Sequence, residues 1–286
     1  MTHKLFIKYP SLLPFRRLAI DIRDLFIEYG LHKNFGVNKY IFKRINGKVG
    51  LEIGGPSWLW RSYVPIYRWA KRVDNLNRAS TTIFGQNHIE GRSTFKYWMM
   101  KSGDQYISEG NYSFFKDDIY DFVVLRDVLE HLANPIKMLV EIRRIIKPGG
   151  VVILTVPNKL GTFDYGRPNT TFAHILNDYI NQTKEDDETH FQEAIDLLHD
   201  HIAPEYTSRD ELTKLIKNNV KTRFLHHHVF SEETLSRVCS ESGFRTVLLT
   251  KEVFPEIIIM AEKYTDRNLT LKPSMEIIKS YQSVKK

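Results

Sequence analysis

Cysteine is nearly absent from this chain of 286 residues, and the single Cys239 excludes an internal disulfide bond. A chain without disulfides suits a reducing compartment, so we expect a cytoplasmic protein. The sequence also has no run of eighteen apolar residues and no signal peptide of the usual form, which predicts no transmembrane helix. Internal repeats and low-complexity segments are missing too. These absences leave one enlarged domain, or a domain with a cap, as the expected organisation.

Acidic residues are fewer than basic residues in this chain. The 41 Lys and Arg outweigh the 34 Asp and Glu, and the formal net charge is +7. This balance would suit an acidic partner such as nucleic acid, a phosphorylated carrier or a membrane face. The basic residues are spread along the chain except near the termini, which favours an ordinary solvated surface and makes nucleic acid a less favoured partner. The basic, part-apolar segment from His3 to Arg23 would allow peripheral membrane contact, although a helix that docks on the core is favoured.

The dinucleotide fingerprint G-x-G-x-x-G is also missing, which disfavours an NAD-dependent oxidoreductase. In its place, residues 49–58 read VGLEIGGPSW. A β-compatible run ends at Gly54-Gly55-Pro56, and Ser57 is a suitable cap for a following helix through Trp60. Glycines let the backbone approach a ligand closely, and helix-start N–H groups attract anions. The segment therefore predicts an anion or nucleotide cradle, with an ordinary tight turn as the alternative.

Further strands and helices alternate along the chain, as in a parallel sheet. We expect strands over 49–53, 72–74, 106–109, 120–125 and 151–156, and a loop with a short helix over 77–103. The continuous apolar run 120–125 is typical of a strand buried on both faces. Asn134 and Pro135 are a good N-cap and first position for a helix that ends at Pro148-Gly149-Gly150. This unit predicts a right-handed parallel crossover.

The last third of the chain departs from a bare α/β pattern. Residues 159–230 contain helical patterns near 171–181 and 189–201, and they are too long for a structureless loop, so we predict a helical cap over the active site. Ser231 then begins a helix that ends at Ser242-Gly243, followed by an antiparallel pair over 244–250 and 256–262. The predicted organisation is a helical segment at 1–46 with a helix over 11–30, the core at 47–158 and 231–263, the cap at 159–230 and a basic tail at 264–286.

The stretch from Tyr120 to Asn158, YDFVVLRDVLEHLANPIKMLVEIRRIIKPGGVVILTVPN, resembles the class I S-adenosylmethionine-dependent methyltransferases, type 11-like. LEIGGP is similar to their first motif, VDN to the second and ISEGN to the third. The chain departs from the usual E/D-x-G-x-G-x-G at residues 52–57, and similar turns occur in members linked to surface-polysaccharide synthesis. The resemblance implies a Rossmann-like fold with a seven-stranded, mostly parallel sheet, helices on both faces and a helical cap insertion. It also implies S-adenosylmethionine as the cofactor.

The resemblance implies roles for residues at these motifs. The expected cofactor-binding residues are Glu52, Gly54, Gly55, Pro56, Asp74, Glu109, Gly110, Arg126 and Asp127. Asp74 would hold the ribose, Glu109 the adenine side, and Arg126 and Asp127 would lie beside the methyl group. His131 would be the catalytic base, together with Asp127. A histidine bonded to a neighbouring loop is the structural alternative for His131.

The spacing D-x-x-E-H of Asp127, Glu130 and His131 would place three ligand atoms on one turn, and one of the histidines 226–228 would complete a divalent metal site. Some 2′-O-methyltransferases of small RNAs use a similar E-x-x-E-H arrangement with magnesium. Because E-H at this point is common in members without a metal, we expect no bound metal.

Polar residues between aromatics in the cap suit a hydroxyl-rich, small-molecule or glycan acceptor. They include Asp164, Arg167, His174 and Asp178. The segment resembles methyltransferases that accompany glycosyltransferases in surface-glycan clusters, and this implies O-methylation of a saccharide or a carrier-linked acceptor. An RNA 2′-O-methyltransferase and a catalytically silent scaffold of the same fold remain as alternatives. The oligomeric state does not follow from the sequence.

Overall fold

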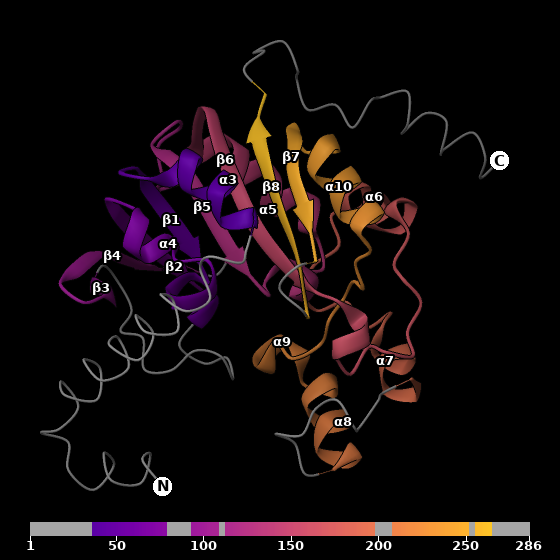
Figure 1. Ribbon diagram of the computed structural model, residues 1–286. Coiled ribbons are helices and arrows are strands. Elements are labelled where there is room, and N and C mark those ends of the chain that lie inside the picture. Colours follow the sequence, from indigo (N-terminus) through magenta and orange to yellow (C-terminus); the bar gives the residue numbers. More distant parts are fainter. Residues whose placement is uncertain (1–35, 79–92, 109–111, 198–207, 252–254, 265–286) are drawn as a thin grey trace, which may run out of the picture.

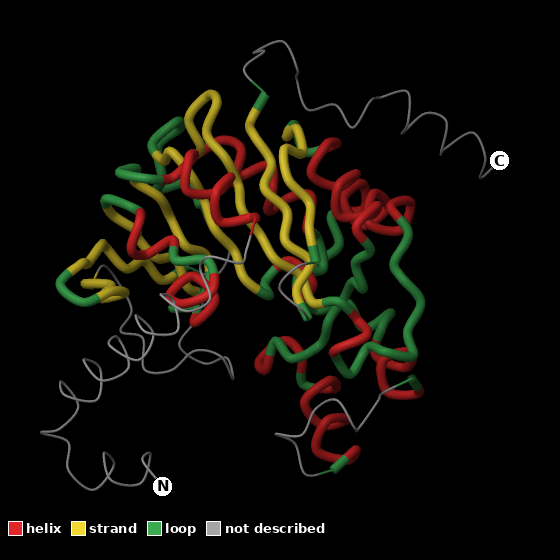
Figure 2. The backbone as a smooth tube through the Cα atoms, in the orientation of Figure 1, coloured by secondary structure: helices red, strands yellow, loops and turns green. Residues whose placement is uncertain are grey.

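A computed structural model describes residues 36–78, 93–108, 112–197, 208–251 and 255–264. Within these ranges a single eight-stranded sheet runs through the centre of the molecule, in the order β3-β4-β2-β1-β5-β6-β8-β7 (Figures 1 and 2). The strands are β1 (Val49–Ile53), β2 (Arg72–Asn77), β3 (Ser93–Trp98), β4 (Lys101–Ile107), β5 (Tyr120–Arg126), β6 (Ile146–Pro157), β7 (Phe244–Thr250) and β8 (Glu256–Lys263).

The sheet is mostly parallel. β4, β2, β1, β5 and β6 are parallel neighbours, whereas β8 pairs antiparallel with both β6 and β7. The Rossmann-like α/β fold expected from the sequence is therefore confirmed, as are the limits of β1 and the closing antiparallel pair. The carboxyl ends of the five parallel strands lie at one edge of the sheet, which is where open α/β folds bind their ligands.

The eighth strand corrects the prediction of a loop with a short helix over 77–103. β3 pairs antiparallel with β4, and β4 itself begins at Lys101. In β3, Phe95 and Tyr97 are buried while Lys96 between them is exposed. This alternation is the pattern of a strand with one buried face, too short here to stand out from its polar surroundings.

Helices cover both faces of the sheet. On one face lie α3 (Gly36–Ile45), the π-helical turn η2 (Leu59–Tyr63) and α4 (Ile66–Trp69); on the other lie α5 (Pro135–Ile145), α6 (Phe172–Asn181) and α10 (Glu232–Glu241). The predicted helix starts are confirmed: Asn134 Oδ1 accepts from Lys137 N, and Ser231 Oγ accepts from Thr234 N. Each layer buries its own apolar cluster against the sheet.

The predicted cap at 159–230 divides into two parts. α6 buries Phe172, Ile175 and Leu176 in the main core and packs against α5 and α10, so it belongs to the core layer. The turn η4 (Lys159–Gly161) precedes it. The remaining helices are α7 (Phe191–Asp196), α8 (Arg209–Lys217) and α9 (Asn219–Thr222). A separate small apolar cluster joins α7 and α8 to Phe224 and Leu225, which follow α9. In Figure 1 these helices lie below the sheet, beyond the end of β6. We keep the name helical cap for residues 182–230.

Some predictions fall on residues that the structure does not describe. The helix over 11–30, Glu109, Gly110 and nearly all of the basic tail lie outside the described residues. Among the helices that are described, none has the length and apolar character needed to cross a membrane.

Candidate active site

The turn after β1 begins with two glycines, Gly54 and Gly55. Gly54 and Gly55 have φ angles of 84° and 79°, a left-handed conformation that side chains disfavour. A Cβ atom on Gly55 would lie 2.3 Å from the Glu52 carboxylate, and one on Gly54 would lie 3.0 Å from the Val128 side chain. Both positions therefore require glycine, and the turn brings β1 against the segment that follows β5.

The side chain of Glu52 braces this turn from behind. It is buried, Oε1 accepts from Ser57 N at 3.2 Å, and Oε2 accepts from the Tyr67 hydroxyl at 2.6 Å. Burial raises its pKa to about 8. The Ser57 N–H is thus used inside the protein, and the predicted helix at this point is the π-helical turn η2, which begins at Leu59. Pro56 follows a cis peptide bond in the same turn.

Asp74, the predicted ribose ligand, lies within the sheet and short of its carboxyl edge. It is the third residue of β2, paired with Leu51 inside the sheet. Its Oδ1 accepts from Arg72 Nε at 2.7 Å and from Asp104 N at 2.9 Å, and its Oδ2 accepts from the Tyr120 hydroxyl at 3.0 Å. A residue that reaches the ligand edge must stand at the carboxyl end of the strand, and the structure gives that position to Asn77.

Asparagines of β2 hold the glycine turn in place. Asn75 Nδ2 donates to the Gly54 carbonyl, and Asn77 Nδ2 donates to the Gly55 carbonyl at 3.3 Å. Buried amides that fix a loop through its carbonyl groups set the direction of the peptide groups in that loop. The two asparagines therefore pre-form the turn. Sequence reasoning missed them because it placed the end of the strand at Asp74.

Arg126 and Asp127 stand at the carboxyl end of β5. Arg126 Nη2 lies 2.7 Å from Glu256 Oε1 and 3.0 Å from Asp127 Oδ2, and its guanidinium stacks 4.7 Å from the ring centroid of Trp58. Asp127 has a φ angle of 50°, uncommon for a residue with a side chain, and such strain clusters at functional sites. Burial, with Glu256 nearby, raises the pKa of Asp127 well above its ordinary value.

The structure brings part of the predicted metal group together. Ligand atoms of Glu130, His131 and His226 all lie within 4.8 Å of one another. Glu130 and His131 are in the turn η3 (Leu129–His131), and His226 comes from the segment after α9. Asp127 is not in this group, and neither are His227 and His228. His227 Nε2 pairs with Asn219 Nδ2 at 3.2 Å, while His228 faces other histidines.

Glu130 is buried, and within the described residues neither of its carboxylate oxygens has a hydrogen-bond partner. Burial, followed by repulsion from Asp127, raises its pKa well above the ordinary value. The Nδ1 of His131 lies 3.1 Å from the Leu225 carbonyl, so Nδ1 carries the proton and Nε2 the lone pair. Burial, followed by the nearby His226, lowers the pKa of His131 well below its ordinary value, which keeps this histidine neutral.

The cap is held against this edge by a buried ionic network. Arg167 Nη1 donates to Asp164 Oδ1 at 2.7 Å and to the His226 carbonyl at 2.8 Å, and its Nε donates to Glu193 Oε1 at 2.9 Å. Asp164 Oδ2 in turn bonds His226 Nδ1. Asp164 and Arg167, predicted to face an acceptor, are thus nearly fully buried and paired with each other.

Taken together, the carboxyl edge of the sheet carries a side-chain-free turn, a strained acid and a neutral histidine. Gly54 and Gly55 leave main chain without side chains at this edge, because an added Cβ would meet the Val128 side chain at Gly54 and the Glu52 carboxylate at Gly55. Main chain without side chains lets a ligand approach closely. These residues therefore fit a bound nucleoside-type donor.

Comparison with protein-family models identifies the family of this chain. The model of the methyltransferase domain family matches residues 100–249, more than half of the chain. None of the curated proteins matches. Solved structures similar to this chain include an S-adenosylmethionine-dependent methyltransferase from Methanosarcina mazei, with 15% identity, 79% of this chain and 98% of that chain covered, and a TM-score of 0.43.

Two further solved structures have similar values. Human N-acetylserotonin methyltransferase, in complex with S-adenosylmethionine, is 16% identical, with 85% of this chain and 56% of that chain covered and a TM-score of 0.41. A methyltransferase from Aquifex aeolicus is 11% identical over 80% of this chain and 89% of that chain, with a TM-score of 0.38. On the family match, the chain belongs to the methyltransferase domain family and is an S-adenosylmethionine-dependent methyltransferase.

Proposed function

We propose that this enzyme transfers a methyl group to a hydroxyl of a saccharide or of a carrier-linked acceptor, in the cytoplasm. The observation that carries the proposal is the position of His131. A neutral histidine, fixed by a main-chain carbonyl at Nδ1, lies at the same sheet edge as the glycine turn and Asp127. That arrangement suits removal of a hydroxyl proton beside a bound methyl donor.

Residues of the edge would hold the donor as follows. The main chain of Gly54 and Gly55 would lie against the carboxypropyl end, and Asn77 at the end of β2 would face the ribose. Arg126 and Asp127 would lie on the methyl side. When bound, S-adenosylmethionine supplies an electrophilic methyl group. The β1 turn lies outside the residues matched by the family model, so these assignments rest on its geometry.

His131 is suited to the proton transfer. Because Nδ1–H is committed to the Leu225 carbonyl, Nε2 is the nitrogen that accepts the proton. The lowered pKa keeps the ring neutral at pH 7, which is the state that can accept a proton. General-base catalysis of this kind contributes roughly 10²–10⁴-fold to a rate.

A saccharide acceptor is supported by the exposed aromatic ring beside the turn. Trp58 is 47% exposed although its ring stacks on Arg126 and meets Tyr63 edge to face. An amphipathic ring held rigidly at a ligand edge offers an apolar face to C–H groups and leaves polar neighbours for hydroxyls. Asp164 and Arg167 give no such support, since they pair with each other.

The test begins with titration of S-adenosylhomocysteine, followed by transfer of a labelled methyl group to sugars, nucleotide sugars, lipid-linked saccharides and RNA. We expect transfer to a saccharide. His131→Asn should lower kcat by about 100-fold and leave the affinity for S-adenosylhomocysteine unchanged. His227→Asn is the matched control, at a buried histidine whose Nε2 pairs with Asn219 Nδ2. Product binding without transfer to any acceptor would identify a silent scaffold.

One observation favours a second candidate, an RNA 2′-O-methyltransferase. Glu130, His131 and His226 lie close enough to share one divalent ion, and Glu130 is buried without a hydrogen-bond partner among the described residues. For this function the labelled methyl would go to RNA and the rate would depend on Mg²⁺. Full activity on a saccharide after removal of divalent ions would exclude it.

A further inference from the structure

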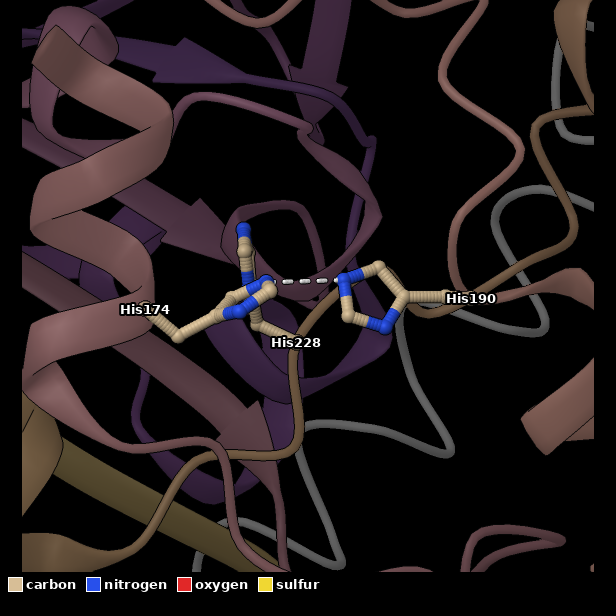
Figure 3. A group of neighbouring side chains, drawn as sticks. All are labelled: His174, His190 and His228. Carbon is tan, nitrogen blue, oxygen red and sulfur yellow. Dashed lines mark hydrogen bonds between the residues drawn. The ribbon is translucent and has the colours of Figure 1, made fainter. Parts of the chain in front are cut away.

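A second group of histidines lies between α6 and the helical cap, away from the proposed base. His174 belongs to α6, His190 immediately precedes α7, and His228 lies between α9 and α10. Figure 3 shows their rings converging on one point. One ring nitrogen from each lies within 4.8 Å of the other two, and the Nε2 atoms of His174 and His190 are 3.0 Å apart. Three segments far apart in the sequence thus supply three imidazoles to one place.

A carboxylate lies beside two of the three histidines. Asp178 lies one helical turn after His174, so both side chains share a face of α6. Its Oδ2 lies 3.3 Å from His174 Nε2 and 3.9 Å from His228 Nε2. The other oxygen, Oδ1, accepts from the Thr183 hydroxyl at 3.1 Å, which fixes the orientation of the carboxylate. Outer partners of this kind are typical of ligands that bind a metal ion.

Polar atoms in this group are buried without partners. His228 is almost fully buried, and within the described ranges neither of its ring nitrogens makes a hydrogen bond of ordinary geometry. Burial lowers the pKa of His228 well below its ordinary value, and the neighbouring Ala133 backbone opposes this shift only in part. Asp178 Oδ2 likewise has no hydrogen bond among the residues described. Buried polar groups are nearly always satisfied in folded proteins, so these atoms point to a missing partner.

The types of side chain in this group indicate which metal ion would bind. Imidazole ligands suit Zn²⁺ and its transition-metal neighbours, whereas Mg²⁺ prefers oxygen ligands and keeps its waters. Around a tetrahedral zinc with bonds of about 2.0–2.1 Å, ligand atoms are separated by about 3.3 Å. The separations of 3.0 Å between His174 and His190, and of 3.3 Å between His174 and Asp178, are close to this value. His174 and His190 are only half-buried, so an ion has a route from solvent and their rings have room to adjust.

We propose that His174, His190, His228 and Asp178 form a binding site for a divalent transition-metal ion, with zinc the preferred ion. The ion fastens the cap residues His190 and His228 to α6, which packs in the core. The His228 main-chain N–H also donates to the Glu130 carbonyl at 3.2 Å. The site is therefore a cross-link that holds the cap beside the active edge, and this role is separate from methyl transfer.

The test uses the full chain without a histidine tag, since a tag would bind zinc itself. The ion content is measured after purification and after chelation, and the chelated protein is titrated with Zn²⁺, Mg²⁺ and Co²⁺. We expect one zinc per chain assigned to this site, a rise in the melting temperature with Zn²⁺ but not with Mg²⁺, and the intense visible absorption of tetrahedral Co²⁺.

Variants locate the ion. His190→Gln and His174→Gln, at half-buried positions that tolerate exchange, should each weaken zinc binding by at least about tenfold and remove the Co²⁺ spectrum. His131→Gln belongs to the other histidine group and should keep the spectrum. The proposal is overturned if chelated protein takes up no stoichiometric zinc, or if His190→Gln binds zinc as the wild type does. Loss of the spectrum in His131→Gln alone would overturn it as well, by moving the ion to Glu130, His131 and His226.

Discussion

The glycine turn after β1 and the helical cap face the same sheet edge, yet they are held in different ways. At the turn, buried Glu52 is satisfied by neutral donors, the Tyr67 hydroxyl and the Ser57 N–H. At the base of the cap, Arg167 is satisfied by the nearby Asp164 carboxylate and by two groups of the cap, the Glu193 carboxylate and the His226 carbonyl.

The difference concerns the range of the contacts. The partners of Glu52 lie 5 and 15 residues away in sequence, whereas His226 lies 59 residues from Arg167 and 62 from Asp164. The turn needs only these near neighbours and the adjacent strand β2, whose Asn75 and Asn77 hold its carbonyl groups from 21 and 22 residues away. A cap closed by distant ionic contacts exists only once the whole chain has folded, so it is the more easily lost part. The following changes test this contrast, beginning with the largest expected effect.

Gly55→Ala should have the largest effect on the turn. The new Cβ would lie 2.3 Å from the Glu52 carboxylate at a φ angle of 79°. The turn must therefore change its path, and we expect affinity for S-adenosylhomocysteine to fall by about 100-fold or more by calorimetry, equivalent to about 2.7 kcal/mol. Gly47→Ala is the control, because its φ angle of 71° is similar and an added Cβ meets no described atom within 4 Å. Equal losses in the two variants would show that backbone strain alone is responsible.

Arg167→Leu should have the corresponding effect on the cap. It leaves Asp164 buried without its cationic partner, which typically costs about 3–5 kcal/mol. We expect protease cleavage within 182–230 at temperatures where the sheet stays folded by circular dichroism. The matched control is Arg245→Leu, which removes a 63% exposed partner of Glu262 and should cost less than about 1 kcal/mol. If the cap and the sheet unfold together in one cooperative transition, the cap is not the more easily lost part.

Glu52→Gln should change how stability depends on pH. The folded-state pKa of Glu52, about 8, exceeds the ordinary 4.5, so between these values the folded protein binds more protons than the unfolded chain. Stability from this group therefore falls as pH rises from about 5 to 8, by up to about 1.4 kcal/mol per pH unit. Glu52→Gln should remove that decline, as measured by urea unfolding at several pH values. Asp117→Asn, at an exposed ion pair, should keep the wild-type slope.

Two substitutions on β2 test which residue contacts the ribose, Asp74 as the motif resemblance implies or Asn77 as its position at the end of the strand suggests. Asn77→Ala should weaken binding of S-adenosylhomocysteine by about tenfold, the value of one hydrogen bond. Asp74→Asn should lower the melting temperature, because Arg72 and Tyr120 lose a charged partner, and should change the affinity by less than about twofold. The reverse pattern would restore Asp74 as the ribose ligand.

Local patterns determined much of the fold. The sequence predicted the strands β1, β5 and β6 from their apolar runs, and the turn after β1 from Gly-Gly-Pro. It also predicted the helix N-caps Asn134 and Ser231. These features depend on residues a few positions apart in the chain. The short alternation in β3 was missed because its buried residues are few and lie in a polar segment.

Only the tertiary structure decided the side-chain roles. Whether Asp74 or Asn77 reaches the ligand edge depends on the register of β2 against β1 and β4, which no local pattern fixes. The sequence grouped His226, His227 and His228 together, but the fold sends them to three different sets of partners. The reason is that successive residues of an extended segment face different directions, and their partners come from helices and turns far away in the chain.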